Sequence, residues 1–581
     1  MNLINQIWLK KITIICIFFF ISLPFFINAQ TTYIPFGDKQ YDVLDRLEIK
    51  TRDQQLFHSV IKPYSRKASV EQVEMIDSML NIKSDYANLT KVDKYNIQNL
   101  LMDNSEWSKP SDYYLSKHPV FGKNGLYKTK DNLIEINNKN FFLAINPELY
   151  FSVGKENNNS NNLYQTSYGI NLRGMISHAV GFNFSITNNQ ERDPQYVNDW
   201  IITHSAVPNE GTYNVTYLNN GNIDHVNYVD ARGSVAWKVT RHIDMQFGYD
   251  KNFIGDGYRS LFLSDFSSSA TFFKINTRIW KFNYENLYME LYLPGVTSLT
   301  GYSKLPHKYG RFNELSINAT KWLNLGVFEG VIFGRPDHYD YSYMVPVLFL
   351  RPAESNVGSG DNAVVGFHAK ANLAGKFQLY GQFLLDELKV SELVKGTGWW
   401  GNKNGIQFGV KYVDAFGLKN TDVQLEINQV RPYTYSHYDS VGDYTHFNQP
   451  LAHPLGANFR EINAIVNAQP LPRLYLKGQL TYYLQGLDSL AADGHYIDYG
   501  ANPFLNYDLR PRDYGFKVGD GDKATCTIFT GTVSYELKEN MFVEVTAFYR
   551  NFKLASLPSS QKTTTINVSF RWNMGRREFI F

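Results

Sequence analysis

Gly405-Ile406-Gln407-Phe408-Gly409-Val410-Lys411-Tyr412 alternates strictly between two kinds of side chain. One face of this stretch carries Ile, Phe, Val and Tyr, and the other carries Gly, Gln, Gly and Lys. The same alternation returns at 423–428 and at 566–572. Successive side chains of a β-strand point to opposite faces, so each segment is predicted to be a strand with one apolar and one polar face.

The chain begins with features of an export signal. Lys10 and Lys11 precede an apolar stretch at 12–26, and Ala29 offers a small residue at a plausible cleavage site. This order is typical of a cleaved signal peptide over residues 1–29. Pro24 and the shortness of the stretch argue against the alternative, a retained anchor helix.

Repeated alternating strands after a signal peptide predict an outer-membrane β-barrel, with lipid outside and a polar lumen inside. The candidate strands are 141–153, 168–175, 182–187, 232–239, 245–249, 272–280, 284–291, 314–319, 325–333, 363–371, 377–385, 405–413, 422–430, 462–468, 475–483, 525–535, 541–549 and 565–572. Many are near the roughly 9–11 residues of a tilted membrane-spanning strand. The predicted fold class is therefore an all-β transmembrane barrel of about 18 antiparallel strands, located in the outer membrane.

Residues 30–120 differ from the rest and predict a small, mainly helical segment. Helical spacing links Tyr41, Leu44 and Leu47, and it recurs over 70–82 and 95–101. This segment is expected to plug the barrel or to cover its periplasmic mouth, with a loosely structured linker as the alternative. The predicted domains are the signal peptide (1–29), the helical segment (30–120) and the barrel (121–581).

Charge and cysteine content exclude several classes of function. Cleavage after residue 29 would reduce the 57 basic residues to 55, equal to the 55 acidic ones. A neutral chain without a basic stripe gives no indication of nucleic-acid binding. Cys526 would be the only cysteine left, which excludes an intramolecular disulfide and a thiolate metal cluster. The 40 Tyr residues suit a barrel, because Tyr gathers at membrane interfaces.

Four long polar connections, at 189–224, 292–312, 433–459 and 485–522, are the candidate surface loops. Their aromatic and acidic residues suit sugars, although solvated loop is the simpler interpretation of any one residue. The loop aromatics are Trp200, Tyr433, Tyr435, Tyr438 and Tyr444. The last residues, 577–581, end in Phe581 and resemble the assembly signal by which the barrel assembly machinery recognises outer-membrane barrels.

Residues 251–265 read Lys-Asn-Phe-Ile-Gly-Asp-Gly-Tyr-Arg-Ser-Leu-Phe-Leu-Ser-Asp. This stretch resembles the Wzi-like capsule-assembly outer-membrane proteins, as do 345–354, 360–365 and 377–388. The resemblance runs from about residue 31 to the end and is strongest to the gliding-motility-associated RemB-like branch of the Bacteroidota. It implies a monomeric barrel that attaches or organises capsular polysaccharide at the cell surface. For that branch, it also implies a link to gliding and adhesion proteins.

Ionic and aromatic residues concentrate in the family-like stretch. The predicted glycan-binding or lumen cluster consists of Tyr258, Arg259, Asp265, Arg351, Glu354, Asp361, Tyr380 and Asp386. Charge is costly on the lipid face, so residues within strands should face the lumen. One interpretation is an ion-pair ladder that braces the wall, and the other is a site for an acidic glycan with Arg259 and Arg351 as donors. Gly255 and Gly257 are expected to allow a tight bend or a close backbone approach.

Catalytic motifs are missing from the sequence. Asp386 and Glu387 are adjacent and would point to opposite faces of a strand, and no nucleophile elbow, His-Glu-x-x-His motif or metal spacing occurs. We expect no cofactor and no enzymatic activity. The alternative to polysaccharide attachment is a diffusion channel or porin-like transporter. The helical segment, with Tyr380, Phe548 and Trp280 as bulky inward residues, would argue for a filled lumen instead. Trp399-Trp400 is interpreted as an anchor in the lipid interface rather than a sugar platform.

Overall fold

The computed structural model describes residues 31–54, 58–82, 89–120, 125–157, 159, 161–177, 179–293, 306–335, 338–346, 360–491 and 493–581. The predicted signal peptide at 1–29 lies outside these residues. Among the described helices, none has both the length and the apolar character needed to cross a membrane.

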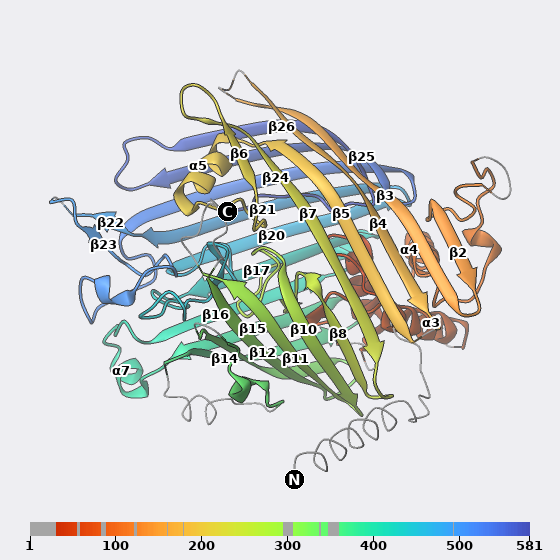
Figure 1. Cartoon of the computed structure of the whole chain (residues 1–581), viewed down its shortest axis with the longest axis horizontal. Coiled ribbons are helices and arrows are strands. Elements are labelled where there is room, and N and C mark those ends of the chain that lie inside the picture. Colours follow the sequence, from red (N-terminus) through yellow and green to blue (C-terminus); the bar gives the residue numbers. More distant parts are fainter. Residues whose placement is uncertain are drawn as a thin grey trace, which may run out of the picture.

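Eighteen antiparallel strands form a closed barrel, as the sequence predicts (Figure 1). Each wall strand pairs with the next wall strand along the chain, and β26 pairs with β3 to close the ring. The wall strands are β3 (Phe141–Glu156), β4 (Asn162–Ile176), β5 (Val180–Arg192), β7 (Ile223–Lys238), β8 (Ile243–Asp250), β10 (Ala270–Ile279), β11 (Phe282–Tyr292), β12 (His307–Asn318), β13 (Leu323–Phe333), β14 (Asn362–Leu373), β15 (Phe377–Glu387), β16 (Lys403–Tyr412), β17 (Thr421–Val430), β20 (Phe459–Leu471), β21 (Leu474–Leu487), β24 (Asp522–Lys538), β25 (Met541–Leu554) and β26 (Gln561–Trp572). Two short strands, β2 (Ile134–Asn138) and β6 (Asn214–Tyr217), extend β3 and β7 beyond the ring.

The wall side chains alternate between the outside and the lumen. Phe408 and Ile566 are exposed on the outer surface, whereas Gln407 and Glu426 are buried on the inner side. An apolar outer band around a closed barrel is the arrangement that a bilayer requires, because no strand edge is left unpaired in lipid. The protein is therefore an outer-membrane barrel.

Connections at the two ends of the barrel differ in length. One end has short turns such as 280–281, 374–376 and 472–473, and the other has long connections such as 193–222 and 488–521. Short turns face the periplasm in outer-membrane barrels, so the long connections mark the outer end. Trp280 lies in a short turn and is exposed, with a φ of 55°, so the prediction that it faces the lumen is wrong.

Three helices lie where the amphipathic runs of the N-terminal segment predict them. They are α2 (Gln40–Thr51), α3 (Arg66–Ile82) and α4 (Lys91–Asp103). Thr90 begins α4 with a capping box, in which its hydroxyl and the Asp93 carboxylate exchange hydrogen bonds with each other's backbone N–H groups. Leu44, Val73 and Leu100 help to form a small core between the helices. The helices lie at the short-turn end of the barrel (Figure 1).

Two of the long connections fold back into the lumen and fill it. The first, called the inward loop (251–269), contains β9 (Phe253–Ile254), which pairs with β1 (Ile61–Lys62) of the N-terminal segment. The second inward loop (431–458) contains β18 (Thr445–His446) and β19 (Gln449–Pro450), which pair with each other. Both loops pack against inward apolar residues of the wall, such as Phe312 and Phe328. The predicted polar lumen is therefore wrong in part, because the folded-back loops need an apolar core of their own.

Candidate functional site

The tip of the inward loop is held against the barrel wall by one carboxylate. Glu426 of β17 accepts hydrogen bonds from the backbone N–H groups of Tyr258 and Arg259, at 2.7 Å and 3.0 Å. The Tyr380 hydroxyl of β15 donates to the same carboxylate at 2.7 Å. Three predicted cluster residues, Tyr258, Arg259 and Tyr380, are thus brought together around Glu426, a residue that the sequence analysis missed.

Gly257 makes the close approach that the sequence predicts for this motif. A Cβ atom at residue 257 would lie 2.4 Å from the Glu426 carboxylate and 2.8 Å from the Arg259 carbonyl oxygen. Side chains do not tolerate contacts of this length, so glycine is required here. The Gly-Asp-Gly segment therefore serves to dock the loop on the wall.

Ion pairs extend from this tip across the lumen. The Arg259 guanidinium lies 3.4 Å from Glu461, whose carboxylate also contacts His453 at 2.8 Å. Asp256 pairs with Lys370 at 3.1 Å, and Lys370 pairs with Glu48 of α2 at 2.8 Å. These pairs join the N-terminal segment, the inward loop and the wall, which agrees with the ion-pair ladder that the sequence offered as one interpretation.

The remaining predicted cluster residues lie apart from this network. Asp386 accepts a hydrogen bond from the backbone N–H of Tyr435 in the second inward loop, at 2.8 Å. The carbonyl oxygen of Asp265 accepts from Lys251, and Asp361 lies at the outer rim. Arg351 and Glu354 lie outside the described residues. Glycan binding by any member of the cluster stays a prediction.

Residues 573–581, called the tail, run from the end of β26 back through the lumen. Gly575 lies against Gly37 near the helical segment, and Phe581 packs against Tyr196 and Trp200 at the outer end. The last wall strand ends at Trp572. The terminal aromatic is therefore part of the lumen filling, and its role as an assembly signal stays a prediction.

The tail is fixed by charges along its length. Arg576 pairs with Glu544 at 2.8 Å, and Glu578 pairs with Lys477 at 3.0 Å. Between them, Arg577 pairs with Glu191 and Glu210 at 3.1 Å and 2.7 Å. Phe581 also packs in a cluster with α5 (Gln195–His204), a helix in the connection between β5 and β7. The tail thus ties the wall to an outer loop.

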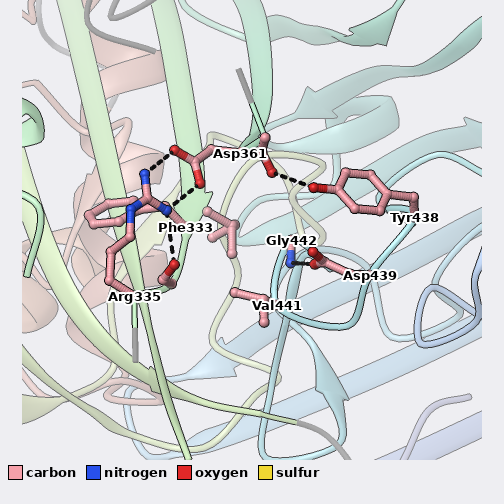
Figure 2. Close-up of a pocket in the computed structure, with 10 residues that line it drawn as sticks. Phe333, Arg335, Asp361, Tyr438, Asp439, Val441 and Gly442 are labelled. Atoms are coloured by element: carbon pink, nitrogen blue, oxygen red, sulfur yellow. Dashed lines mark hydrogen bonds and ion pairs between the residues drawn. The ribbon is translucent and has the colours of Figure 1, made fainter. Parts of the chain in front are cut away.

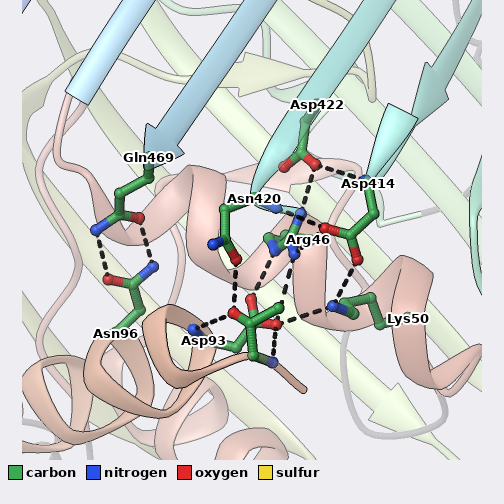
Figure 3. A network of polar contacts seen from close by, with 9 residues as sticks. Arg46, Lys50, Asp93, Asn96, Asp414, Asn420, Asp422 and Gln469 are labelled. Atoms are coloured by element: carbon green, nitrogen blue, oxygen red, sulfur yellow. Dashed lines mark hydrogen bonds and ion pairs between the residues drawn. The ribbon is translucent and has the colours of Figure 1, made fainter. Parts of the chain in front are cut away.

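A second ion network holds the helical segment to the periplasmic turns (Figure 3). Arg46 of α2 pairs with Asp93 and Asp414, each at 2.6 Å, and also with Asp422 at the start of β17. Lys50 joins Asp93 to Asp414 at 2.8 Å each. Burial alone would raise the pKa of Asp93, but the hydrogen bonds and charges of Arg46 and Lys50 outweigh it and hold that pKa below its usual value.

A small pocket of about 260 Å³, called the rim pocket, opens at the outer end (Figure 2). The Arg335 guanidinium forms two hydrogen bonds of 2.8 Å with the Asp361 carboxylate, which fixes one wall. Tyr438 and Asp439 of the second inward loop line another part, and about half of each side chain remains exposed. Small-molecule sites usually measure about 300–1,000 Å³, so this pocket suits one unit of a longer ligand.

Of the loop aromatics expected to suit sugars, only Tyr438 is well exposed. Tyr433, Tyr435 and Tyr444 are buried, and the hydroxyls of the last two donate to the carbonyl groups of Leu261 and Phe262 in the inward loop. Trp200 stacks on His204 within the cluster around α5. Tyr435 and Tyr444 thus pack the two inward loops together. In the described part of the chain, no group of three or more His, Cys, Asp and Glu residues is arranged to hold a metal ion.

No protein-family model and no curated protein sequence matches the chain. Among solved structures, it is similar to Wzi from Escherichia coli, described as an outer-membrane, carbohydrate-binding β-barrel involved in group 1 capsule assembly. The identity is 12% and the TM-score 0.53, over 94% of this chain and 100% of Wzi. OprD from Pseudomonas aeruginosa matches with 11% identity and a TM-score of 0.39, over 74% of this chain and 94% of OprD. The Wzi-like fold is thus supported, whereas nothing in these comparisons supports the gliding-associated branch.

Proposed function

We propose that this protein is a non-enzymatic outer-membrane barrel that attaches or organises surface polysaccharide, and so supports adhesion and gliding. The observation that carries the proposal is the filled lumen. The two inward loops, the tail and β1 occupy the interior of an 18-strand barrel, a size that otherwise leaves an aqueous channel. A filled lumen argues against the alternative of a diffusion channel and leaves the outer rim as the surface for a ligand.

The chemistry of the rim pocket supports a carbohydrate. Tyr438 offers an aromatic face, and the Asp439 carboxylate can accept hydrogen bonds from sugar hydroxyls. The Arg335–Asp361 pair braces the pocket without using either of these groups. A polysaccharide repeats the same unit many times, so one small pocket, helped by further contacts along the rim, can hold a long chain by avidity. The fold likeness to Wzi, which is described as a carbohydrate-binding barrel, is consistent with this ligand class.

Binding of purified polysaccharide tests the proposal. Full-length protein refolded in detergent should bind the surface polysaccharide of its own organism in titration calorimetry. Tyr438→Ala with Asp439→Asn should weaken binding about tenfold, which corresponds to about 1.4 kcal/mol. Leu490→Ser, at an exposed residue of the hairpin formed by β22 (Ser489–Leu490) and β23 (Tyr496–Ile497), is the matched control and should bind normally. Absence of binding by the unmodified protein, or equal binding by all variants, would contradict the proposal.

A further inference from the structure

The connection between β15 and β16 carries an exposed apolar face at the outer end of the barrel. Its short helix, α7 (Val390–Lys395), lies beside the barrel at this outer end (Figure 1). Val390, Leu393 and Val394 are 60%, 51% and 81% exposed, and the preceding Leu388 is 40% exposed. Single exposed apolar residues are ordinary, but four within seven residues form a patch that needs a partner.

The opposite side of α7 is fixed to the protein. Glu392 is buried, and its carboxylate accepts a hydrogen bond from Thr397 at 3.0 Å. Backbone hydrogen bonds of 2.9 Å then join 397–398 to Gly515 and Phe516 of the connection between β21 and β24. The helix is therefore held in one orientation, with its apolar face turned away from the barrel.

The wall strands next to α7 also carry exposed apolar residues. Phe383 of β15 and Ile406 of β16 are paired neighbours in the sheet, and both are exposed on the outside. β15 ends at Glu387, three residues before α7 begins. At about 3.3 Å per residue, the helix begins within roughly 10 Å of the end of the strand. This distance is similar to the depth of the lipid headgroup region.

Basic residues flank the apolar face. Lys389 precedes α7 and its side chain is 54% exposed; its ammonium group lies 3.6 Å from the Glu392 carboxylate and 5.4 Å from the centre of the Trp399 ring, which leaves its outer side open to a second anion. Lys395 ends the helix and makes no ion pair with any residue that the structure describes. Apolar residues at the acyl boundary with lysines beside them are the combination that binds anionic lipid surfaces.

We propose that α7 and its flanking lysines form a lipid-binding shelf, which takes an anionic, phosphate-bearing lipid of the outer leaflet. Val390, Leu393 and Val394 contact the acyl chains, and Lys389 and Lys395 contact the phosphate. Trp399, beside Lys389, then lies at the interface, as the sequence predicts for this Trp pair. This contact does not depend on polysaccharide binding. It should make the lipid more ordered on the side of the barrel that carries α7.

Spin labels in the full-length protein test the shelf. Cys526 is buried, so single cysteines can be placed at chosen exposed sites in a background that carries Cys16→Ser and Cys526→Ser. A nitroxide at Val394→Cys should meet dissolved oxygen severalfold more often than a water-soluble nickel complex, as should the wall control Phe383→Cys. The loop control Leu490→Cys should show the reverse preference. A label at residue 394 that behaves like the one at 490, or that neither collider reaches, would overturn the lipid contact.

The headgroup preference has its own readout. Replacing phosphatidylcholine vesicles by mixtures with phosphatidylglycerol should slow the motion of the label at residue 394. The double variant Lys389→Gln with Lys395→Gln should lose most of that response, while the label at Phe383→Cys should be unaffected in either background. An equal response with and without the two lysines would overturn the selection of an anionic headgroup.

Discussion

Single residues in the lumen show what a sequence can and cannot predict. Strand alternation placed Tyr380 and Gln382 on the inner face of β15, and both are buried there. Alternation gave no partner for either residue. Glu426, which holds the Gly255–Arg259 tip, comes from a strand 168 residues beyond Tyr258, and only the closed ring brings the two together. Local periodicity fixes the direction of a side chain, but its contacts depend on the register of distant strands.

Gly257→Ala should destabilise the docked inward loop. The added Cβ would meet the Glu426 carboxylate and the Arg259 carbonyl, and overpacking of this kind costs about 1–3 kcal/mol. We expect a lower midpoint of thermal unfolding in detergent. Gly478→Ala is the matched control, because a Cβ there meets no atom within 4 Å. Equal midpoints for the two variants would contradict the account of the Gly-Asp-Gly motif.

Arg46→Met should loosen the helical segment from the periplasmic end. The change removes the Arg46 pairs with Asp93 and Asp414 while Lys50 keeps its own, so the cost should be at most about 3–5 kcal/mol, the cost of a fully broken buried ion pair. Limited proteolysis should then cut residues 31–120 faster than in the unmodified protein. Lys94→Met, at an exposed residue of α4, is the control and should be cut at the normal rate.

The same network predicts a dependence on acid. The pKa values of Asp93 and Asp414 lie below the usual value of 3.8, because the charges and hydrogen bonds of Arg46 and Lys50 outweigh the effect of burial. Their contribution to stability is therefore present at neutral pH and is lost as the pH falls below about 4. Proteolysis of the unmodified protein should accelerate there, with a smaller change in Arg46→Met.

At the scale of elements, the wall was predictable and its filling was not. All 18 strands and three helices lie at or near the predicted residues, because each carries its own period of apolar residues. The inward loops and the tail have no such period. One signal could have revealed the inward loop: Phe253, Ile254 and 261–263 are apolar residues in a connection, where a solvated loop would be polar. Whether residues 30–120 form a separate domain stays a prediction.

Removing the tail should open the lumen without preventing insertion. A stop codon after Gly575 leaves β26 complete, so the barrel should still close through β3. It removes Arg577 from between Glu191 and Glu210 and Phe581 from beneath α5. We expect ion conductance in planar bilayers, where the full-length protein is silent. Leu490→Ser is the control and should stay silent. Conductance by the unmodified protein would instead support a channel.

At the scale of the whole molecule, the barrel has a filled lumen beneath its outer rim. The helices α2, α3 and α4 lie at the periplasmic end, the inward loops and tail occupy the lumen, and the rim pocket faces outward. The closed ring was predictable from sequence because strand count and alternation determine it. The rim pocket was not, since Arg335 and Asp361 meet Tyr438 and Asp439 only after a loop has folded across the barrel.

Deletion of the gene in its own organism tests the proposed function most directly. The measurement is the fraction of surface polysaccharide that stays attached to cells, set against the fraction shed into the medium, beside colony spreading. We predict that polysaccharide is shed and spreading is impaired, and that full-length protein restores both while Tyr438→Ala with Asp439→Asn restores them poorly. Normal attachment together with normal spreading in the deletion strain would contradict the account.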